Sequence, residues 1–417
     1  MSEWKEVRLG DVCNIFGRIG FRGYTINDLV SSKDEGAISL SPTNIIDGEI
    51  NVDKCSYISW NKYYESPEIM IFKNDILIVK TGSSYGRTAL VKEVKHQMTI
   101  NPQFVVLKNI NINPIYLSYY IKSKTFQNQI SSIVVGSAIP TLSQKNLANL
   151  YLKIQGSQTQ QEIAGILSSL DAKIETNNKL NEKLEEMAQA IFKSWFVDFE
   201  PFKDNPFHET ELGMIPEGWE VGIFEDIVDI VGGGTPSKSI SEYYTDNGIA
   251  WITPKDLSLN NNKFTSKGTI DITELGYEKS SAKLMPKGSV LFSSRAPIGY
   301  ITIAKNEICT NQGFKSAVPQ KAGTAFIYYL LKNKTPEIEN MATGSTFKEA
   351  SGTLMKTLRI IIPIKEVLDN FEKIMEPIFN MQLSVEEEND RLASLRDTLL
   401  PRLMSGEIKI SCLWVKK

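Results

Sequence analysis

The stretch from Gln161 to Phe196 constrains the fold of this 417-residue chain most, because it lacks proline and repeats apolar side chains at coiled-coil spacing. Alternate steps of three and four residues visit one stripe, and Lys and Glu fill most of the other positions. The stripe consists of Leu167, Leu170, Ile174, Asn177, Asn181, Leu184, Ala188, Ile191 and Trp195. This pattern predicts one long helix whose apolar face needs a partner.

We expect that partner in the same chain, because the stripe recurs 208 residues later, where Asn181 corresponds to Asn389. An Asn at the same step of both copies suits the fixing of register in a helix pair. We predict that helices 157–197 and 365–406 pair antiparallel as a coiled coil. The predicted pairing residues are Leu170, Ile174, Asn181, Leu184 and Ile191 in the first helix and Ile378, Val385, Asn389, Leu392 and Leu399 in the second. The alternative is that each stripe is the core face of an ordinary long helix.

The segments outside the helices repeat as well, which indicates a duplicated chain. Trp4 and Asp11 return as Trp219 and Asp226 at an offset of 215 residues. Four further blocks follow in the same order: ISLSPTNI and AWITPKDL, FKNDILIVKTGSSYGRTALV and MPKGSVLFSSRAPIGYITIA, INPQF and TNQGF, and YYIKSKT and YLLKNKT. The offset falls gradually to 208 in the helices, as loops of different length between duplicated domains would produce.

Each half is predicted to be an α+β domain. Short β-branched and aromatic segments such as DILIVKTG, QFVVLK, SVLFSS and YITIA are bounded by turn residues, which is typical of strands. The predicted fold is therefore two repeated α+β domains joined by two long antiparallel coiled-coil helices. We expect domain 1 at residues 1–156, a linker without periodicity at 198–218, domain 2 at 219–364 and a tail at 407–417.

Composition favours a soluble protein of the cytoplasm. The chain is 41% hydrophobic and 23% charged, and it contains no apolar run near the roughly 20 residues that span a bilayer. The first residues, MSEWKEVRLGD, are charged and resemble no export signal. Four scattered cysteines and two histidines favour neither a disulfide framework nor a metal site.

Charge is distributed unevenly along the chain. Residues 1–155 carry 17 Lys and Arg against 13 Asp and Glu, a net charge of +4, whereas residues 156–200 carry 4 against 8, a net charge of −4. Residues 201–364 carry 17 against 18, a net charge of −1. Any surface that contacts phosphate is therefore expected on the domains and not along the helices.

Segments that resemble catalytic motifs fail on closer inspection. GGGTPSKS, from Gly232 to Ser239, lacks the spacing of a phosphate-binding loop and is interpreted as a turn. NPQF, from Asn101 to Phe104, is similar to the base-binding motif of amino-methyltransferases, but its repeat NQGF lacks the proline. Neither half has a glycine-rich cofactor loop, and two histidines cannot supply a base in both halves. We predict no catalytic residues, no metal and no cofactor in this chain.

Polar turns that recur in both halves are the candidate DNA contacts, because they offer backbone N–H groups, hydroxyls and cations together. The candidates in the first half are Lys80, Thr81, Ser83, Ser84, Arg87, Gly136, Ser137, Thr141, Gln144 and Lys145. Those in the second half are Ser294, Arg295, Gly344, Ser345 and Lys348. The alternative is that these segments are simple connecting turns.

The whole chain resembles the specificity subunit of type I restriction-modification enzymes. The blocks that carry the resemblance are FVDFEPFK with ELGMIPEGWEVG, GGGTPS, TGSSYGRTAL, SSRAPIG, GSAIPTLSQKNL, GSTFKEASG and LRDTLLPRLMSGEI. The resemblance implies two target recognition domains that each recognise one half of a split double-stranded DNA sequence. It also implies that the helices dock two methyltransferase subunits, that restriction subunits join the complex, and that S-adenosylmethionine, ATP and Mg act on those partners.

Two other functions stay open at this level. The chain could be an assembly scaffold that binds only proteins, or a methyltransferase fused to its own recognition domain, although cofactor motifs are lacking. The negative second domain departs from expectation for a DNA reader. It would depend on clustered cations such as Lys255, Lys283, Lys287, Arg295 and Lys348, or on its partners.

Overall fold

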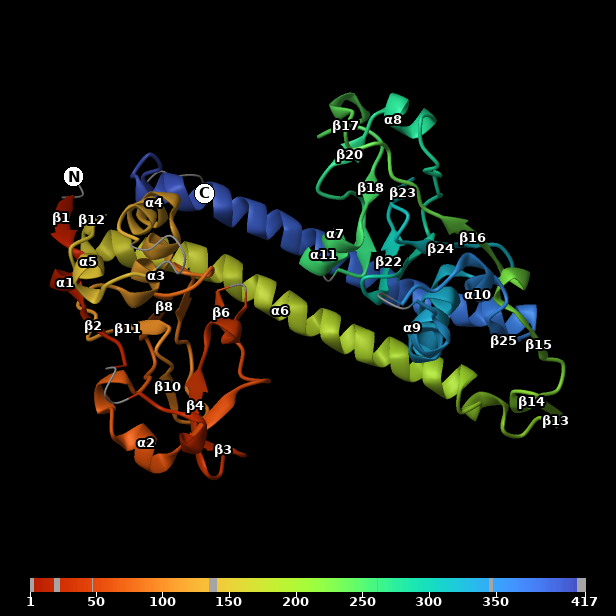
Figure 1. Ribbon diagram of the computed structural model, residues 1–417, viewed down its shortest axis with the longest axis horizontal. Coiled ribbons are helices and arrows are strands. Elements are labelled where there is room, and N and C mark those ends of the chain that lie inside the picture. The colour runs from red at the N-terminus through yellow and green to blue at the C-terminus, as the bar shows by residue number, and fades with distance from the viewer. Residues whose placement is uncertain are drawn as a thin grey trace, which may run out of the picture. The chain divides into compact units, whose positions relative to one another are not determined.

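The structure is a computed structural model that describes residues 4–18, 23–46, 48–134, 141–260, 262–344 and 348–410. The chain divides into two compact units, and both boundaries fall inside the long helices. Unit 1 comprises residues 1–174 and 391–417, and unit 2 comprises residues 175–390. Each unit is an α+β domain that packs on segments of α6 (Ser157–Phe196) and α11 (Lys365–Met404) (Figure 1).

Unit 1 contains two four-stranded sheets. The first has the order β2 (Asn14–Phe16), β11 (Phe104–Lys108), β8 (Ile76–Val79) and β9 (Thr88–Leu90), and all its pairs are antiparallel. The second has the order β10 (Met98–Ile100), β4 (Gly36–Leu40), β7 (Ser56–Ser59) and β3 (Leu29–Val30). β1 (Lys5–Arg8) pairs with β12 (Tyr151–Ile154), and β5 (Ile45–Ile46) pairs with β6 (Glu49–Ile50). The helices are α1 (Leu9–Val12), α2 (Trp60–Tyr64), α3 (Pro114–Lys122), α4 (Lys124–Ser132) and α5 (Gln144–Ala148).

Unit 2 contains one five-stranded sheet. Its order is β16 (Val228–Gly232), β24 (Lys315–Pro319), β21 (Val290–Ser294), β22 (Ile298–Ala304) and β19 (Phe264–Thr265). The smaller pairs are β15 (Glu220–Ile223) with β25 (Arg359–Ile362), β17 (Tyr244–Thr245) with β20 (Asp271–Ile272), and β18 (Trp251–Ile252) with β23 (Cys309–Thr310). The helices are α7 (Pro254–Leu259), α8 (Glu274–Glu278), α9 (Thr324–Met341) and α10 (Gly352–Lys356).

The two units repeat the same local hydrogen bonds, which supports the duplication predicted from the sequence. Three turns in each unit are closed in the same way, by a backbone N–H that donates to the side chain of an Asp or Asn. They are the turn after the first strand, the turn that contains Pro42 or Pro254, and the turn that begins at Asn101 or Asn311. The pairs are Arg8 to Asp11 and Ile223 to Asp226, Ser41 to Asn44 and Thr253 to Asp256, and Gln103 to Asn101 and Gly313 to Asn311, all at 2.8–2.9 Å. NPQF in the first copy and its counterpart NQGF in the second therefore both form Asx turns.

Within each unit, α6 and α11 run antiparallel. In unit 1, Arg396 donates to Asp171 at 2.8 Å. In unit 2, the Asn177 amide donates to Asn389 at 2.9 Å, and the Phe192 and Phe371 rings lie 6.1 Å apart. Residue numbers on α11 fall as those on α6 rise, which is the antiparallel order predicted from the sequence.

The predicted stripe is covered along its length, but much of it packs into the domain cores. Ile378 and Val385 are buried, whereas Leu170, Ile174, Asn181, Leu184, Ile191, Asn389, Leu392 and Leu399 are half-buried. Leu184, Ile191 and Ile378 belong to the unit 2 core, and Leu399 packs against the unit 1 core. The amide of Asn389 also donates to Asn178 at 2.7 Å. Asn181 Oδ1 is buried without a hydrogen-bond partner among the described residues.

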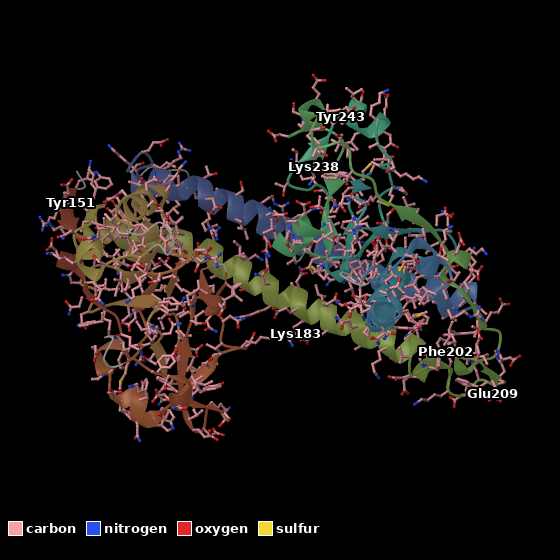
Figure 2. All side chains as sticks on the ribbon, viewed as in Figure 1. Tyr151, Lys183, Phe202, Glu209, Lys238 and Tyr243 are labelled. Carbon is pink, nitrogen blue, oxygen red and sulfur yellow. The ribbon has the colours of Figure 1, made fainter. Side chains whose placement is uncertain are left out.

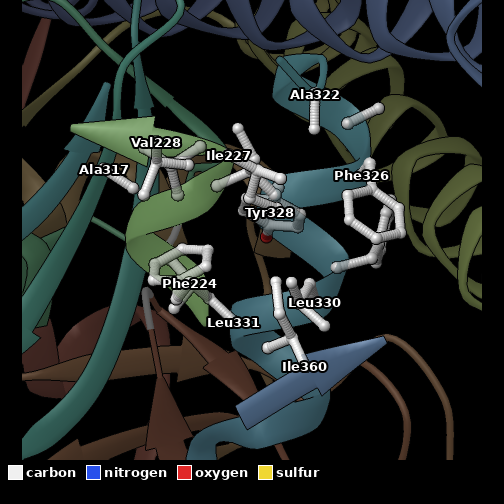
Figure 3. Packing of buried hydrophobic residues seen from close by; sticks show 14 of the residues in the cluster. Phe224, Ile227, Val228, Ala317, Ala322, Phe326, Tyr328, Leu330, Leu331 and Ile360 are labelled. Carbon is white, nitrogen blue, oxygen red and sulfur yellow. The ribbon is translucent and has the colours of Figure 1, made fainter. Parts of the chain in front are cut away.

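Helix α9 is the centre of the unit 2 core. Leu331 lies on the side of α9 that meets Phe224 and Ile360 of β25, whereas Phe326 lies on the other side of the helix (Figure 3). Phe326 also contacts Phe196 of α6, with ring centroids 4.9 Å apart. Burial of side chains of this size contributes about 1.5–3 kcal/mol each, so the domain and the helix stabilise one another.

The predicted linker 198–218 has more structure than its composition suggested. It contains a hairpin of β13 (Phe207–Thr210) and β14 (Gly213–Pro216), although no hydrophobic periodicity announces it. Phe199 and Phe202 lie 5.5 and 5.1 Å from the ring of Trp219. Their aromatic contacts anchor this segment to the unit 2 core, where Trp219 is buried.

A buried charged cluster joins domain 2 to both long helices. The ammonium group of Lys263 contacts Glu185 of α6 at 2.5 Å, Gln382 of α11 at 2.7 Å and the Tyr329 hydroxyl at 2.6 Å. Glu386 of α11 accepts the backbone N–H of Lys263 at 2.8 Å. A buried ion is stable only where hydrogen bonds and an opposite charge accompany it. These contacts therefore favour one position of the domain on its helices.

The same cluster shifts three pKa values. Burial opposes ionisation of Glu185, but Lys263 and Lys332 outweigh it and hold the pKa of that carboxyl at about 2. Burial lowers the pKa of Lys263 to about 8 despite the neighbouring Glu185. Burial raises the pKa of Glu386 to about 7, against the opposing hydrogen bonds from the Lys263 and Phe264 backbone.

We predict that Glu386→Gln changes the pH dependence of stability. Because the folded-state pKa of Glu386 is raised from 4.5 to about 7, its contribution is fully present below pH 4.5 and is lost as pH rises through about 7. The Gln variant stays neutral and does not lose this contribution. The free energy of unfolding of the variant minus that of wild type should therefore be about 1–3 kcal/mol larger at pH 8 than at pH 4.5. Urea unfolding followed by Trp fluorescence at both pH values measures this change.

The neighbouring Glu387→Gln is the control. Glu387 is half-exposed and lies 3.7 Å from Lys305, so its substitution should leave the difference between the two pH values unchanged. Equal pH dependence in wild type and Glu386→Gln would contradict the prediction.

Candidate nucleic-acid interface

The first predicted turn of unit 1 is the connection between β8 and β9. Gly86 N–H donates to Val79 O at 2.8 Å and Arg87 N–H donates to Ser84 O at 3.2 Å, so the turn is closed by its own backbone. Ser83 and Arg87 are exposed, while Lys80, Thr81 and Ser84 are half-buried. Burial lowers the pKa of Lys80.

The second predicted turn of unit 1 lies beside the first. Thr81 and Thr141 form an antiparallel bridge, and Leu142 N–H donates to Lys80 O at 2.8 Å. Ser143 then caps α5 by accepting the N–H of Asn146 at 3.0 Å. This cap places the exposed side chains of Gln144 and Lys145 in the first turn of the helix. Gly136 and Ser137 fall outside the described residues.

Unit 2 repeats this arrangement. Arg295 and Glu349 form the equivalent bridge, and Ala350 N–H donates to Ser294 O at 2.9 Å. Ser351 caps α10 through the N–H of Leu354 at 3.0 Å. The turns predicted separately in the sequence are thus neighbours in both domains.

Three of the candidates in unit 2 have a defined local environment. Ser294 is fully buried and its hydroxyl donates to Gly313 O at 3.1 Å, so the structure does not present this side chain at the surface. Gly344 is exposed with φ +145°, and exposed Lys348 donates to Glu339 O at 3.1 Å. Ser345 falls outside the described residues. We therefore leave Ser294 out of the proposed DNA contacts, because its burial and its bond to Gly313 make it part of the turn.

Arg295 is half-exposed and already paired. Its guanidinium lies 3.2 Å from Glu349, which also lies 3.5 Å from Lys315. Arg295 and Lys315 share this one carboxylate, so the three side chains together carry a net charge of about +1. A half-exposed ion pair of this kind contributes little to stability, so the guanidinium can exchange its carboxylate for another acceptor at low cost.

Arg295 also lines a cleft of about 660 Å³ in unit 2 that sequence reasoning did not identify. Its wall includes two further cations, Lys238 and Lys255, and the polar turn Asn311–Gly313. Lys238 lies in the lobe of unit 2 that carries β17 and β20 (Figure 2). Tyr244 and Trp251 add aromatic surface. Such a combination of cations, amides and aromatic faces suits nucleic-acid contact.

The glycine-rich turn beside this cleft has a packing role. A Cβ atom at Gly233 would lie 1.9 Å from the carbonyl oxygen of Asn311, and one at Gly234 would lie 2.3 Å from the backbone nitrogen of Ala282. The glycines therefore permit close approach of backbone segments. The run of three glycines at 232–234 was the sequence signal available for such a close approach.

Comparison with known proteins decides the family. Residues 1–186 and 216–392 each match the family described as the type I restriction modification DNA specificity domain. The chain belongs to this family of DNA specificity subunits. The two matched regions correspond to the two copies of the repeat, each with part of its long helix, and the chain is accordingly a DNA-recognition subunit and not a catalytic one.

One relative spans almost the whole of this specificity subunit, and a more similar one matches less than half of it. The specificity subunit of the type I restriction enzyme HindI from Haemophilus influenzae is 28% identical over 98% of this chain and 100% of its own length. That of MjaIX from Methanocaldococcus jannaschii is 40% identical over 42% of each chain. The crystal structure of the S subunit of a type I system from M. genitalium shares the fold, with a TM-score of 0.58, 16% identity and 96% of both chains covered.

No helix within the described ranges combines the length and the apolar character needed to cross a bilayer.

We predict that Arg295→Ala weakens binding of the specific target more than binding of random DNA. If the guanidinium forms two hydrogen bonds with a guanine edge, the loss on the specific site should be about 1–3 kcal/mol. Competition binding with specific and random duplexes, at matched salt concentration, measures both losses. Lys321→Ala, a cation outside the cleft, is the control, and an equal loss on both duplexes would make Arg295 a phosphate contact instead.

Proposed function

We propose that each domain of this specificity subunit recognises one half of a bipartite double-stranded DNA target. The observation that carries the proposal is the repeated bridge between the two polar turns, Thr81 with Thr141 and Arg295 with Glu349. A duplicated surface that combines cations, hydroxyls and amides suits two separate contacts with one duplex.

The cations and the planar side chains are assigned different roles in this proposal. Lys80, Arg87, Lys145 and Lys348 neutralise phosphates, assisted by the hydroxyls of Thr81, Ser83, Ser84 and Thr141. Gln144, Arg295 and Gln312 have the planar groups that can form paired hydrogen bonds with base edges. Gly136, Ser137, Gly344 and Ser345 are assigned to the DNA contacts as well, because glycine lacks a Cβ and serine supplies a hydroxyl.

Exchange of one domain tests this proposal. Replacement of residues 1–156 with the matching domain of a relative should change one half of the methylated target and leave the other half intact. The physical reason is that each domain has its own core and its own pair of polar turns. Single-molecule methylation mapping in cells gives both halves at once, and alteration of both halves by one exchange would contradict independent recognition.

We further propose that the helices dock two methyltransferase subunits, through which restriction subunits join in the cytoplasm. In unit 2 the helices expose Leu180, Met187, Ile374 and Met381, each between 40% and 50% accessible. Apolar side chains exposed at this level on a helix pair suit a protein interface more than solvent. S-adenosylmethionine, ATP and Mg are assigned to those partners, and none of them to this chain.

Met381→Glu should weaken assembly with the methyltransferase subunit. It removes an exposed apolar side chain and adds a charge that would be desolvated at an interface. Co-purification of the separately tagged subunits measures the effect, with a loss of tenfold or more expected. The neighbouring exposed Asn380→Asp adds the same charge without removing apolar area and is the control. Full assembly of Met381→Glu would contradict docking at this position.

A further inference from the structure

Unit 1 contains a cavity of about 810 Å³ between the domain and its segments of the long helices. Three cations line it: Arg87 from the turn just before β9, Lys122 from the end of α3 and Arg396 from α11. Two carboxylates, Asp171 and Asp397, line it as well. The three cations and two carboxylates give the lining a formal net charge of +1. The residues that line the cavity come from several helices and strands.

Both carboxylates are occupied by neighbours. Asp171 accepts hydrogen bonds from the Tyr119 hydroxyl and from Arg396, the latter at 2.8 Å. Asp397 lies 2.8 Å from the same guanidinium. Arg396 and the two acids therefore satisfy one another, and the positive charge that remains in the cavity belongs to Lys122 and Arg87.

Lys122 is a half-buried cation whose neighbouring carboxylates form no direct ion pair with it within the described residues. Its ammonium group has no hydrogen-bond or ion-pair partner among the described residues, and it lies 5.9 Å from the centre of the Tyr119 ring. Burial lowers the pKa of this ammonium, with Glu49 and Asp171 as the nearest opposing charges. An isolated ammonium in a recess destabilises the fold unless an anion accompanies it.

A second polar group in the cavity wall is also unsatisfied. Thr88 is only 4% exposed, and its hydroxyl has no hydrogen-bond partner within the described ranges. Buried hydroxyls normally have a partner, so an orphan that lines a cavity indicates a ligand or a solvent molecule there. The hydroxyl and the ammonium line the same cavity.

The surrounding backbone leaves space for the lysine. Gly48 has φ +79°, and a Cβ atom at this position would lie 2.9 Å from the Lys122 nitrogen. The Gln127 amide, also in the lining, donates to Gly86 O at 3.1 Å and to Ile121 O at 2.8 Å. The cavity is consequently shaped by the fold and not by mobile side chains alone.

The repeat shows that this charge is a special feature of the first domain. Lys332 is the counterpart of Lys122 in YLLKNKT, and it lies 2.6 Å from Glu185. The same lysine is thus neutralised by α6 in unit 2 and left without an ion-pair partner in the described part of unit 1.

We infer that this cavity binds a phosphate group, held by the Lys122 ammonium, the Arg87 guanidinium and the Thr88 hydroxyl. The inference rests on the proposed function, because Arg87 also belongs to the turn that we assign to DNA. A phosphate of the DNA backbone and a free phosphorylated molecule offer the same chemistry to these groups.

Titration of the full chain with inorganic phosphate tests the site directly. Binding followed by calorimetry should weaken at least tenfold in Lys122→Met and in Thr88→Val, whereas Lys122→Arg should retain most of it. Lys33→Met removes an exposed charge from the same domain, outside the cavity, and is the control. Thr88→Val has nearly the same shape as Thr and serves if Lys122→Met does not fold. Equal phosphate affinity in wild type and both loss variants would overturn the inference.

A second arm identifies the source of the phosphate. Target duplexes with one neutral methylphosphonate at a time are bound to the chain assembled with its methyltransferase subunits. If the DNA backbone fills the cavity, one position should weaken wild-type binding and leave Lys122→Met unaffected, and that variant should lower the salt slope by about one. If no position behaves in this way while inorganic phosphate still binds, the ligand is a free phosphorylated molecule.

The two proposals can fail separately. Specific DNA binding by wild type with phosphate affinity unchanged in the loss variants would reject the cavity and keep the function. Phosphate binding that depends on Lys122, in a complex without sequence-specific DNA binding, would reject the proposed function and keep the anion site.

Discussion

Each long helix contributes side chains to two hydrophobic cores, and the rest of the structure depends on this double use. Helix α6 provides Ile163 and Leu167 to the core of unit 1 and Phe192 and Phe196 to that of unit 2. Helix α11 does the same with Leu403 and Phe371. Since each buried side chain of this size is worth about 1.5–3 kcal/mol, neither domain could detach from the helices without exposing part of its own core.

Apolar burial alone would leave the register of α6 against α11 poorly defined. Polar contacts between the two helices fix that register. Asn177 bonds to Asn389 and Glu388, and Lys263 connects its domain to both helices through Glu185 and Gln382. A shift of register would leave these groups buried and unpaired, at a cost of several kcal/mol. The cluster therefore stabilises one arrangement more by penalising alternatives than by its own net energy.

The duplicated domains combine a common frame with different electrostatics. The Asx turns, the bridge between polar turns and the helix caps recur in both units. The charges placed on that frame differ, as Lys122 and Lys332 show. This combination suits the function that we propose, in which the shared frame positions two DNA contacts and the independent surface residues let each recognise a different sequence.

Periodicity and repetition were sufficient to predict the two helices, their antiparallel order and the two α+β domains, because spacing along the chain determines which face of a helix is apolar. They also located the polar turns, since Thr81 and Thr141 or Arg295 and Glu349 lie in repeated blocks. They did not place Ser294, which is fully buried and whose hydroxyl donates to Gly313 O.

Tertiary structure alone decided the features that require distant residues to meet. The hairpin at 207–216 has no periodic sequence, and its Phe207 contacts Phe199, which in turn contacts Trp219. The Lys263 cluster brings together residues more than 60 positions apart in the sequence. The cavity around Lys122 is lined by residues of β9, α3 and α11. Charge compensation depends on distances in space, so no pattern along the chain could show that Lys332 is neutralised while Lys122 lies in a cavity that we infer to bind phosphate.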